Sequence, residues 1–167
     1  MRLALFALGC AGCAGYTAAS AGFAGDLDGS RPSVHALVEE GAVPAWGGPM
    51  MVGAVAARAG ADVQELRASL GVALRGAPGP VMPFARADVA LLQLGLRDGE
   101  GSFGMFGPHL EVGLGFSLWG RAPDPISRHT APYVSVAAGL GYDVRYVGGS
   151  SASWHAAIGL GWYLVAP

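Results

Sequence analysis

The stretch "PYVSVAAGLGYDVRYVGG", which begins at Pro132, alternates between two kinds of residue with a period of two. One parity is apolar throughout, and the other carries small or polar residues. Successive residues of a β-strand point to opposite faces of a sheet, whereas a helix repeats every 3.6 residues. The alternation therefore predicts a strand with one apolar face, formed by Val134, Val136, Ala138, Leu140, Tyr142, Val144 and Tyr146.

Three further segments, residues 66–75, 109–118 and 152–164, set an apolar parity against Gly, Ala, Ser and charged residues. The stretches "EVGLGFSL", "AAGLGYDV" and "AIGLGWYL" share a Gly-Leu-Gly-aromatic motif. The motif lacks the third glycine and the following helix of a dinucleotide-binding loop. We interpret its paired glycines as thinning the polar face of a strongly curved sheet.

Residues 81–97 also alternate, but the apolar parity changes between Leu91 and Leu92. A slip of one residue is what a β-bulge produces. Residues 33–43 and 49–60 show a weaker strand pattern, and Gly-, Pro- and Asp-Gly-containing connections favour hairpins. The pattern gives seven strands. We expect an eighth, either after the N-terminal leader or at the parity slip, because single-chain bacterial barrels have even strand numbers.

Composition excludes several classes of protein. The chain of 167 residues is 52% hydrophobic and only 13% charged, so it is more apolar than ordinary soluble domains. No stretch in its body offers the roughly 20 apolar residues of a membrane helix. The formal net charge is −2 and no lysine is present, so the basic surface of a nucleic-acid-binding protein is missing.

The first 24 residues have the layout of a secretory signal peptide. Arg2 precedes an apolar run that ends in small residues, with cleavage options after Ala21 or Ala24. One alternative is an uncleaved anchoring helix, and another is a lipoprotein signal in which Cys10 of "ALGC" is lipidated. Cys10 and Cys13 have no second pair to complete a zinc site, so no metal is expected. The predicted organisation is a signal peptide at 1–24 and a barrel at 25–167.

The small-residue face fits the crowded interior of a narrow barrel better than it fits a solvent surface. Trp and Tyr lie near strand ends on the apolar face, as in the aromatic girdles of membrane barrels. In these features the chain resembles the small outer-membrane β-barrels of Gram-negative bacteria, the group with the eight-stranded OmpA-like and OmpX-like proteins. The resemblance implies an all-β, up-and-down antiparallel transmembrane β-barrel of eight strands, located in the cell outer membrane among its lipids.

The last strand carries the sharpest part of the resemblance. Gly159, Trp162 and Leu164 match the C-terminal assembly signal of that family. Ala157 stands where the family has a polar residue, and the chain continues through "VAP" instead of stopping on an aromatic residue. The resemblance implies the barrel assembly machinery as a partner.

If the apolar parity faces lipid, the charged residues of the other parity point inwards. Because an isolated buried charge is costly, we expect them to pair as a lumenal polar cluster of Arg67, Arg75, Arg86, Asp88, Glu111, Asp143, Arg145 and His155. The alternative is lipid-modifying catalysis, in which Ser153 and His155 share a face and Asp143 or Glu111 orients the imidazole. No nucleophile motif supports it, so we expect no enzyme and no cofactor.

The expected function is a structural or interaction role, with loops available for contact. The alternatives are an outer-membrane lipid-modifying enzyme, and a lipid-tethered or periplasmic soluble barrel that binds an apolar ligand and has its faces reversed. A narrow pore through the lumen stays open as a possibility. For the membrane orientation, Leu160→Arg is expected to block assembly, and Gly161→Ser on the opposite face is expected to be milder.

Overall fold

The computed structural model describes residues 14–43, 49–76, 79–118 and 130–164. No helix in these segments could cross a membrane. The strands are β1 (Ala14–Asp26), β2 (Ser33–Val43), β3 (Pro49–Gly60), β4 (Val63–Arg75), β5 (Val81–Arg97), β6 (Glu100–Gly104), β7 (Pro108–Ser117), β8 (Thr130–Asp143), β9 (Arg145–Val147) and β10 (Ser151–Leu164).

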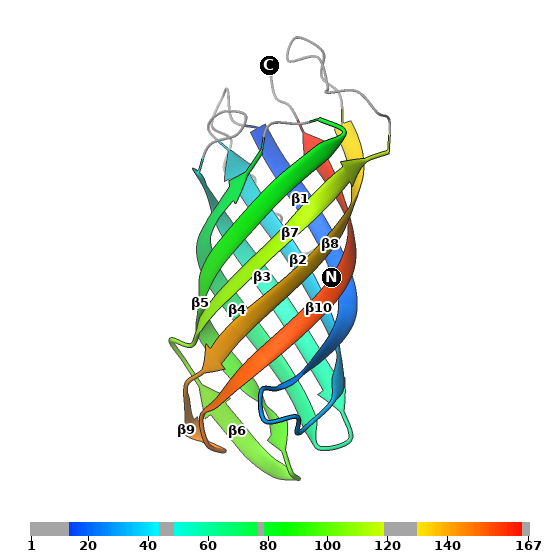
Figure 1. Cartoon of the computed structure of the whole chain (residues 1–167). Coiled ribbons are helices and arrows are strands. Elements are labelled where there is room, and N and C mark those ends of the chain that lie inside the picture. The colour runs from blue at the N-terminus through cyan, green and yellow to red at the C-terminus, as the bar shows by residue number, and fades with distance from the viewer. Residues whose placement is uncertain (1–13, 44–48, 77–78, 119–129, 165–167) are drawn as a thin grey trace, which may run out of the picture.

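Eight of these strands close into an antiparallel barrel (Figure 1). Around it β1 to β5 pair in sequence, followed by β7, β8 and β10, and β10 pairs back onto β1. Every barrel strand therefore has a hydrogen-bonded neighbour on each side, which removes the free edges of an open sheet. The predicted eight-stranded up-and-down barrel is confirmed.

The barrel has a proximal end, where β1 begins and β10 ends, and a distal end, where β1 passes to β2 and β3 to β4 (Figure 1). At the distal end β5 continues beyond the barrel and pairs with β6, which in turn pairs with β9. The two turns of this extension contain Asp98-Gly99 and Gly148-Gly149, all with positive φ. Asp98-Gly99 is the two-residue turn of the β5–β6 hairpin, which needs such residues, and Gly148-Gly149 lies in the three-residue connection from β9 to β10. The predicted Asp-Gly and Gly-Gly turn chemistry is present at both places.

The eighth strand is β1, and it overlaps the segment in which the sequence suggested a leader. Residues 14–24 of that segment pair with β2 and β10 in continuous register. In the described part of the chain the first barrel strand thus includes residues before Gly25, and the parity slip hides no strand. Residues 1–13, which include Cys10, lie outside the described part of the chain.

We expect the barrel in the membrane fraction to retain Ala14–Asp26, because cleavage after Ala21 or Ala24 would cut β1 and remove its pairing with β10. Intact-mass measurement of the extracted protein checks this. Truncated chains that begin at Gly22 or Gly25 should not regain the compact, heat-modifiable form on refolding in detergent, whereas a chain that begins at Ala14 should. Equal refolding of all three chains would contradict the role of β1.

The predicted bulge in β5 is confirmed. Ala68 of β4 pairs with Leu92 while Ser69 pairs with Ala90, so Leu91 is the extra residue. Both Leu91 and Leu92 are exposed on the outer face. The bulge thus allows one long strand to keep its leucines outside on both sides of the slip.

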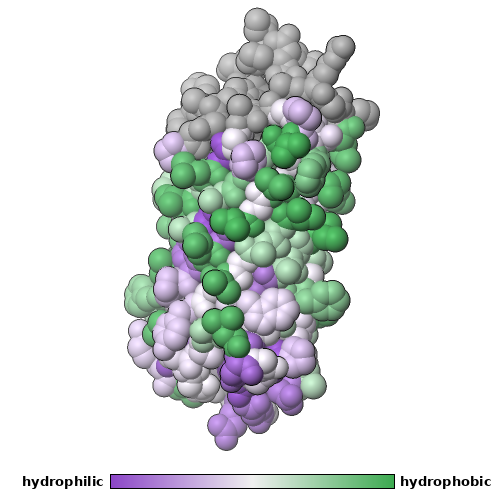
Figure 2. All heavy atoms as spheres, in the orientation of Figure 1, coloured by the Kyte–Doolittle hydropathy of each residue, from purple (hydrophilic) through white to green (hydrophobic). Residues whose placement is uncertain are grey.

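The outer surface of the barrel is apolar, and the interior holds the charged side chains together with an apolar cluster of Tyr16, Ala18, Met50, Val52, Ala73, Met82 and Tyr133. Figure 2 shows hydrophobic residues over the middle of the visible face and hydrophilic ones towards the distal end. Ile158 is 65% exposed, whereas its neighbour Ala157 points inwards and is 7% exposed. The predicted orientation of the two parities is confirmed for the described side chains of β4, β7, β8 and β10.

Paired glycines of the repeated motif make room for rings inside the barrel. A Cβ atom added to Gly139 would overlap the imidazole of His155, and one added to Gly141 would overlap that of His109. Gly113 lies in the same way against the ring of Phe84. The glycines therefore thin the inner wall, as expected, and Gly113, Gly139 and Gly141 each receive a ring from a neighbouring strand.

This packing overturns the expected mildness of Gly161→Ser. A Cβ atom on Gly161 would overlap the ring of Tyr133, which is 1% exposed and has little room to move. A serine there would disturb the interior, so Gly161→Ser is not a suitable control for a change on the lipid-facing side.

Candidate functional site

The barrel interior is the candidate site, and its proximal third is built around Arg75. The guanidinium carbon lies 3.9 Å from the ring centre of Tyr16 and 4.6 Å from that of Phe84. Nη2 donates to Glu39 Oε1 at 2.6 Å, and Nη1 donates to the hydroxyl of Tyr133 at 3.2 Å. Aromatic faces and one carboxylate thus share the charge of a buried arginine.

Arg86 is the centre of the middle third. It forms an ion pair with Glu39, a second with Glu111 at 3.2 Å and a third with Asp88 at 3.0 Å. Glu111 also accepts a hydrogen bond from Nε2 of His155 at 2.8 Å. Three carboxylates from three strands therefore depend on one buried guanidinium.

The distal third continues the pairing towards the mouth of the barrel. Nε2 of His109 bonds Oδ1 of Asp143 at 3.0 Å, and Asp143 pairs with Arg145 at 3.0 Å. Arg145 pairs with Glu65 at 2.9 Å, and Glu65 lies 3.5 Å from Arg97.

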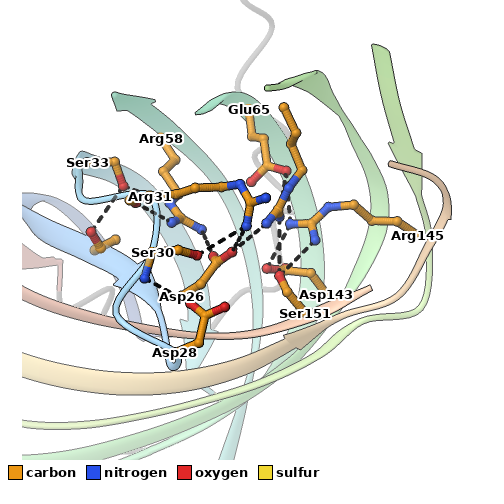
Figure 3. Close-up of polar contacts among 12 residues, drawn as sticks. Asp26, Asp28, Ser30, Arg31, Ser33, Arg58, Glu65, Asp143, Arg145 and Ser151 are labelled. Carbon is orange, nitrogen blue, oxygen red and sulfur yellow. Dashed lines mark hydrogen bonds and ion pairs between the residues drawn. The ribbon is translucent and has the colours of Figure 1, made fainter. Parts of the chain in front are cut away.

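Asp26 of β1 completes the distal group. Its carboxylate accepts from Arg58 at 3.0 Å, from Arg31 at 2.9 Å and from Arg97. Figure 3 shows the guanidinium groups of Arg31 and Arg58 directed at this carboxylate from the surrounding strands and loop. One buried acidic group thus ties β1 to β3, β5 and the β1–β2 loop.

These contacts form one connected ion-pair ladder along the barrel. Its order is Arg75, Glu39, Arg86, Asp88, His109, Asp143, Arg145, Glu65, Arg97 and Asp26, with the link from Asp88 to His109 the longest at 3.8 Å. Each buried charge in it has an opposite or hydrogen-bonding neighbour, which offsets the cost of removing the charge from water. The ladder cross-links strands on all sides of the barrel.

The eight residues of the predicted lumenal cluster all point into the interior. Seven are buried, and Arg67 is partly buried. The sequence did not indicate which residue each of them contacts.

The candidate catalytic residues are brought together only in part: His155 contacts Glu111, one of the two carboxylates expected to orient it, but not Asp143. Asp143 bonds His109 and Arg145, while His155 bonds Glu111 and stacks on His35 with ring centres 4.8 Å apart. No hydrogen bond joins Ser153 to His155 among the described residues.

Several interior residues were missed at the sequence level. Some lie on strands that were expected only weakly or overlap the suggested leader, although period-two alternation around Glu39 and Arg58 was available as a signal; Gln93 and Arg97 lie on a predicted strand beyond its parity slip, and Glu65 lies just before another. The missed residues are Asp26, His35, Glu39, Arg58, Glu65, Gln93 and Arg97.

The assembly-signal residues lie on β10 as the sequence suggested. Gly159 faces the interior and Trp162 is half-exposed on the outer face. The side chain of Leu164 lies outside the described part of the structure.

Arg31 also links two connections across the distal mouth. Its Nη2 donates to Oδ2 of Asp98 in the β5–β6 turn at 2.6 Å, while Nη1 reaches Asp26. The hydrogen bond from Arg31 lowers the pKa of Asp98, and a hydrogen bond with Ser30 lowers that of Asp28. The Arg31–Asp98 contact thus closes the β1–β2 loop onto the extension.

We expect the Arg31–Asp98 contact to persist from neutral pH to about pH 4 and to open as the pH falls further. A carboxyl with a lowered pKa contributes stability above its ordinary pKa of about 3.9, and loses it as pH falls through the lowered value. Amide hydrogen exchange of residues 27–32 and 98–100 measures this opening. Arg31→Gln should abolish the pH step, and a step retained in that variant would assign it to Asp28.

Comparisons with known proteins agree with the geometry. No protein-family model and no curated protein sequence matches the chain. Among solved structures, Neisserial surface protein A is 14% identical with a TM-score of 0.56, over 92% of this chain and 97% of that one. The N-terminal β-barrel domain of Pseudomonas aeruginosa OprF is 13% identical with a TM-score of 0.59, over 91% and 97%. The chain therefore has the fold of the small outer-membrane β-barrels that its sequence resembles.

Proposed function

We propose that this protein is an integral barrel of the bacterial outer membrane with a structural or interaction role. The observation that carries the proposal is the combination of an apolar outer belt with an interior crossed by the ion-pair ladder. Such a surface is stable in hydrocarbon because a closed barrel satisfies all its backbone groups internally. The distal connections and the β6–β9 extension are the parts available for contact outside the membrane.

The outer belt has the height that a membrane requires. Trp154 and Trp162 are eight residues apart on β10, and both are exposed on the outer face. At about 3.4 Å per residue and a tilt of about 40°, they are roughly 20 Å apart along the barrel axis. Membrane barrels carry an apolar band of about 25 Å between aromatic girdles. The one outward carboxylate described on a barrel strand, that of Glu40, lies near the proximal end of β2.

The interior supports a filled barrel over the two alternatives. A soluble barrel that binds an apolar ligand requires an apolar interior, and here charged side chains occupy it. Lipid-modifying catalysis requires a nucleophile bonded to its base, and although Glu111 bonds His155, no hydrogen bond from Ser153 to His155 is found among the described residues.

The test is the behaviour of the wild-type protein in membranes. We expect it to require detergent for extraction, to migrate as a compact species on gels until heated, and to produce no stepwise conductance in planar bilayers, because the ladder fills the lumen. Release by osmotic shock without detergent would overturn the membrane placement. Reproducible conductance steps would overturn the filled interior and favour a pore.

A further inference from the structure

Arg67 differs from the other arginines inside the barrel. Among the described residues, it is the one interior arginine for which no ion pair and no hydrogen bond is found, whereas the five others each contact a carboxylate. Its Nε and Nη2 atoms are fully buried and have no hydrogen-bond partner. Buried groups of this kind are costly unless something bonds them.

Arg67 lines a cavity of about 30 Å³ inside the barrel. Ala56, the neighbour of Arg67 on β3, also lines it, and its small side chain leaves space beside the guanidinium. Gln93, the neighbour on β5, contributes an amide that can donate or accept. At about 10 to 15 Å³ for one water, the space holds two or three water-sized groups.

The unbalanced charge at this cavity is that of Arg67. The carboxylates that line it already form ion pairs, Glu65 with Arg97 and Arg145, and Asp143 with His109 and Arg145. Nδ1 of His35, Oε1 of Gln93 and Oε1 of Glu65 also line it without a hydrogen-bond partner. An anion would therefore meet free donors on the one interior arginine of the described segments that has no carboxylate partner.

The free atoms of Arg67 also define a shape. Nε–H and Nη2–H form one edge of the planar guanidinium, and this edge bonds two oxygens of a planar oxyanion in parallel. We propose that the cavity beside Arg67 is a binding site for a small, planar, monovalent oxyanion of the formate or nitrate class. The site is centred on β3, β4 and β5, and it borders the ladder at Glu65 and Asp143.

The experiment is a titration of the protein, refolded in detergent micelles, with ¹³C-formate observed by NMR. We expect saturable binding at one site per chain and displacement by nitrate. Arg67→Lys keeps the charge but loses the planar edge, so it should weaken formate binding about tenfold or more. Non-saturable binding by the wild type, or unchanged affinity in Arg67→Lys, would overturn the proposal.

A second variant keeps the test informative if Arg67→Lys does not fold. Ala56→Leu fills the cavity without changing any charge and should abolish formate binding. Ala59→Leu makes the same change on the outer face of β3 and should bind formate like the wild type. Equal binding by both alanine variants, or a crystal structure grown in formate with only water against Arg67, would also overturn the site.

Discussion

Ile158→Arg should prevent stable insertion of the barrel into a bilayer. Ile158 lies midway between Trp154 and Trp162 on β10 and is 65% exposed on the outer face. An arginine at the midplane of a lipid-facing strand costs about 2 to 4 kcal/mol, which is a large part of the stability of a small barrel. Urea titration of folding into lipid vesicles, followed by tryptophan fluorescence, measures the loss.

The matched control is Leu96→Arg. Leu96 is 48% exposed on the outer face, near the distal end of β5, and pairs with the polar Gln64. Because the cost of a charge falls to about 0 to 1 kcal/mol near the membrane interface, this variant should fold almost like the wild type. Equal losses for the two variants would mean that the outer face does not meet a hydrocarbon layer at Ile158.

Arg86→Met should destabilise the barrel by about 3 to 5 kcal/mol, because it leaves buried carboxylates without their shared partner. Glu39 keeps Arg75 and Glu111 keeps His155, but Asp88 retains only His109 at 3.8 Å. The free energy of unfolding in urea, with the barrel in micelles, is the measurement.

Adding Asp88→Asn to Arg86→Met should recover part of the lost stability, because the amide removes the least compensated charge. The exposed partner of Arg31 gives the comparison: Asp98→Asn leaves the Arg31–Asp26 pair in place and should change the free energy of unfolding by no more than about 1 kcal/mol. A loss in Arg86→Met as small as that in Asp98→Asn would show that the interior is well hydrated and its ion pairs are screened.

Strands with a bulky apolar parity could be predicted from the sequence, and strands of small residues could not. In β7, β8 and β10 the alternation of large apolar residues with glycine fixed both the strand and its orientation. In β1 the alternation is hidden, because Ala, Ser and Gly occupy both faces around Tyr16 and Phe23. The same small residues are typical of the end of a secretory signal, so composition alone does not distinguish a barrel strand from a signal peptide here.

The membership of the interior cluster was also predictable, but its connections were not. Parity alone decides that Asp143 and His155 point inwards. Which side chain each one meets depends on the stagger between strands around the barrel, and no sequence pattern encodes that. Thus Asp143 meets His109 on the adjacent β7, while His155 reaches Glu111 two strands away.

The seam between β1 and β10 sets the order of events when the barrel folds. It joins the first and last strands described, so it is the pairing with the greatest sequence separation and the slowest to form. Until β1 docks, the sheet has two open edges that invite pairing with other chains. The Asp26–Arg97 pair, which joins β1 to β5 across the barrel, also waits for this closure. Closure of the backbone and neutralisation of the distal interior are therefore a single late step, and refolding should be limited by it.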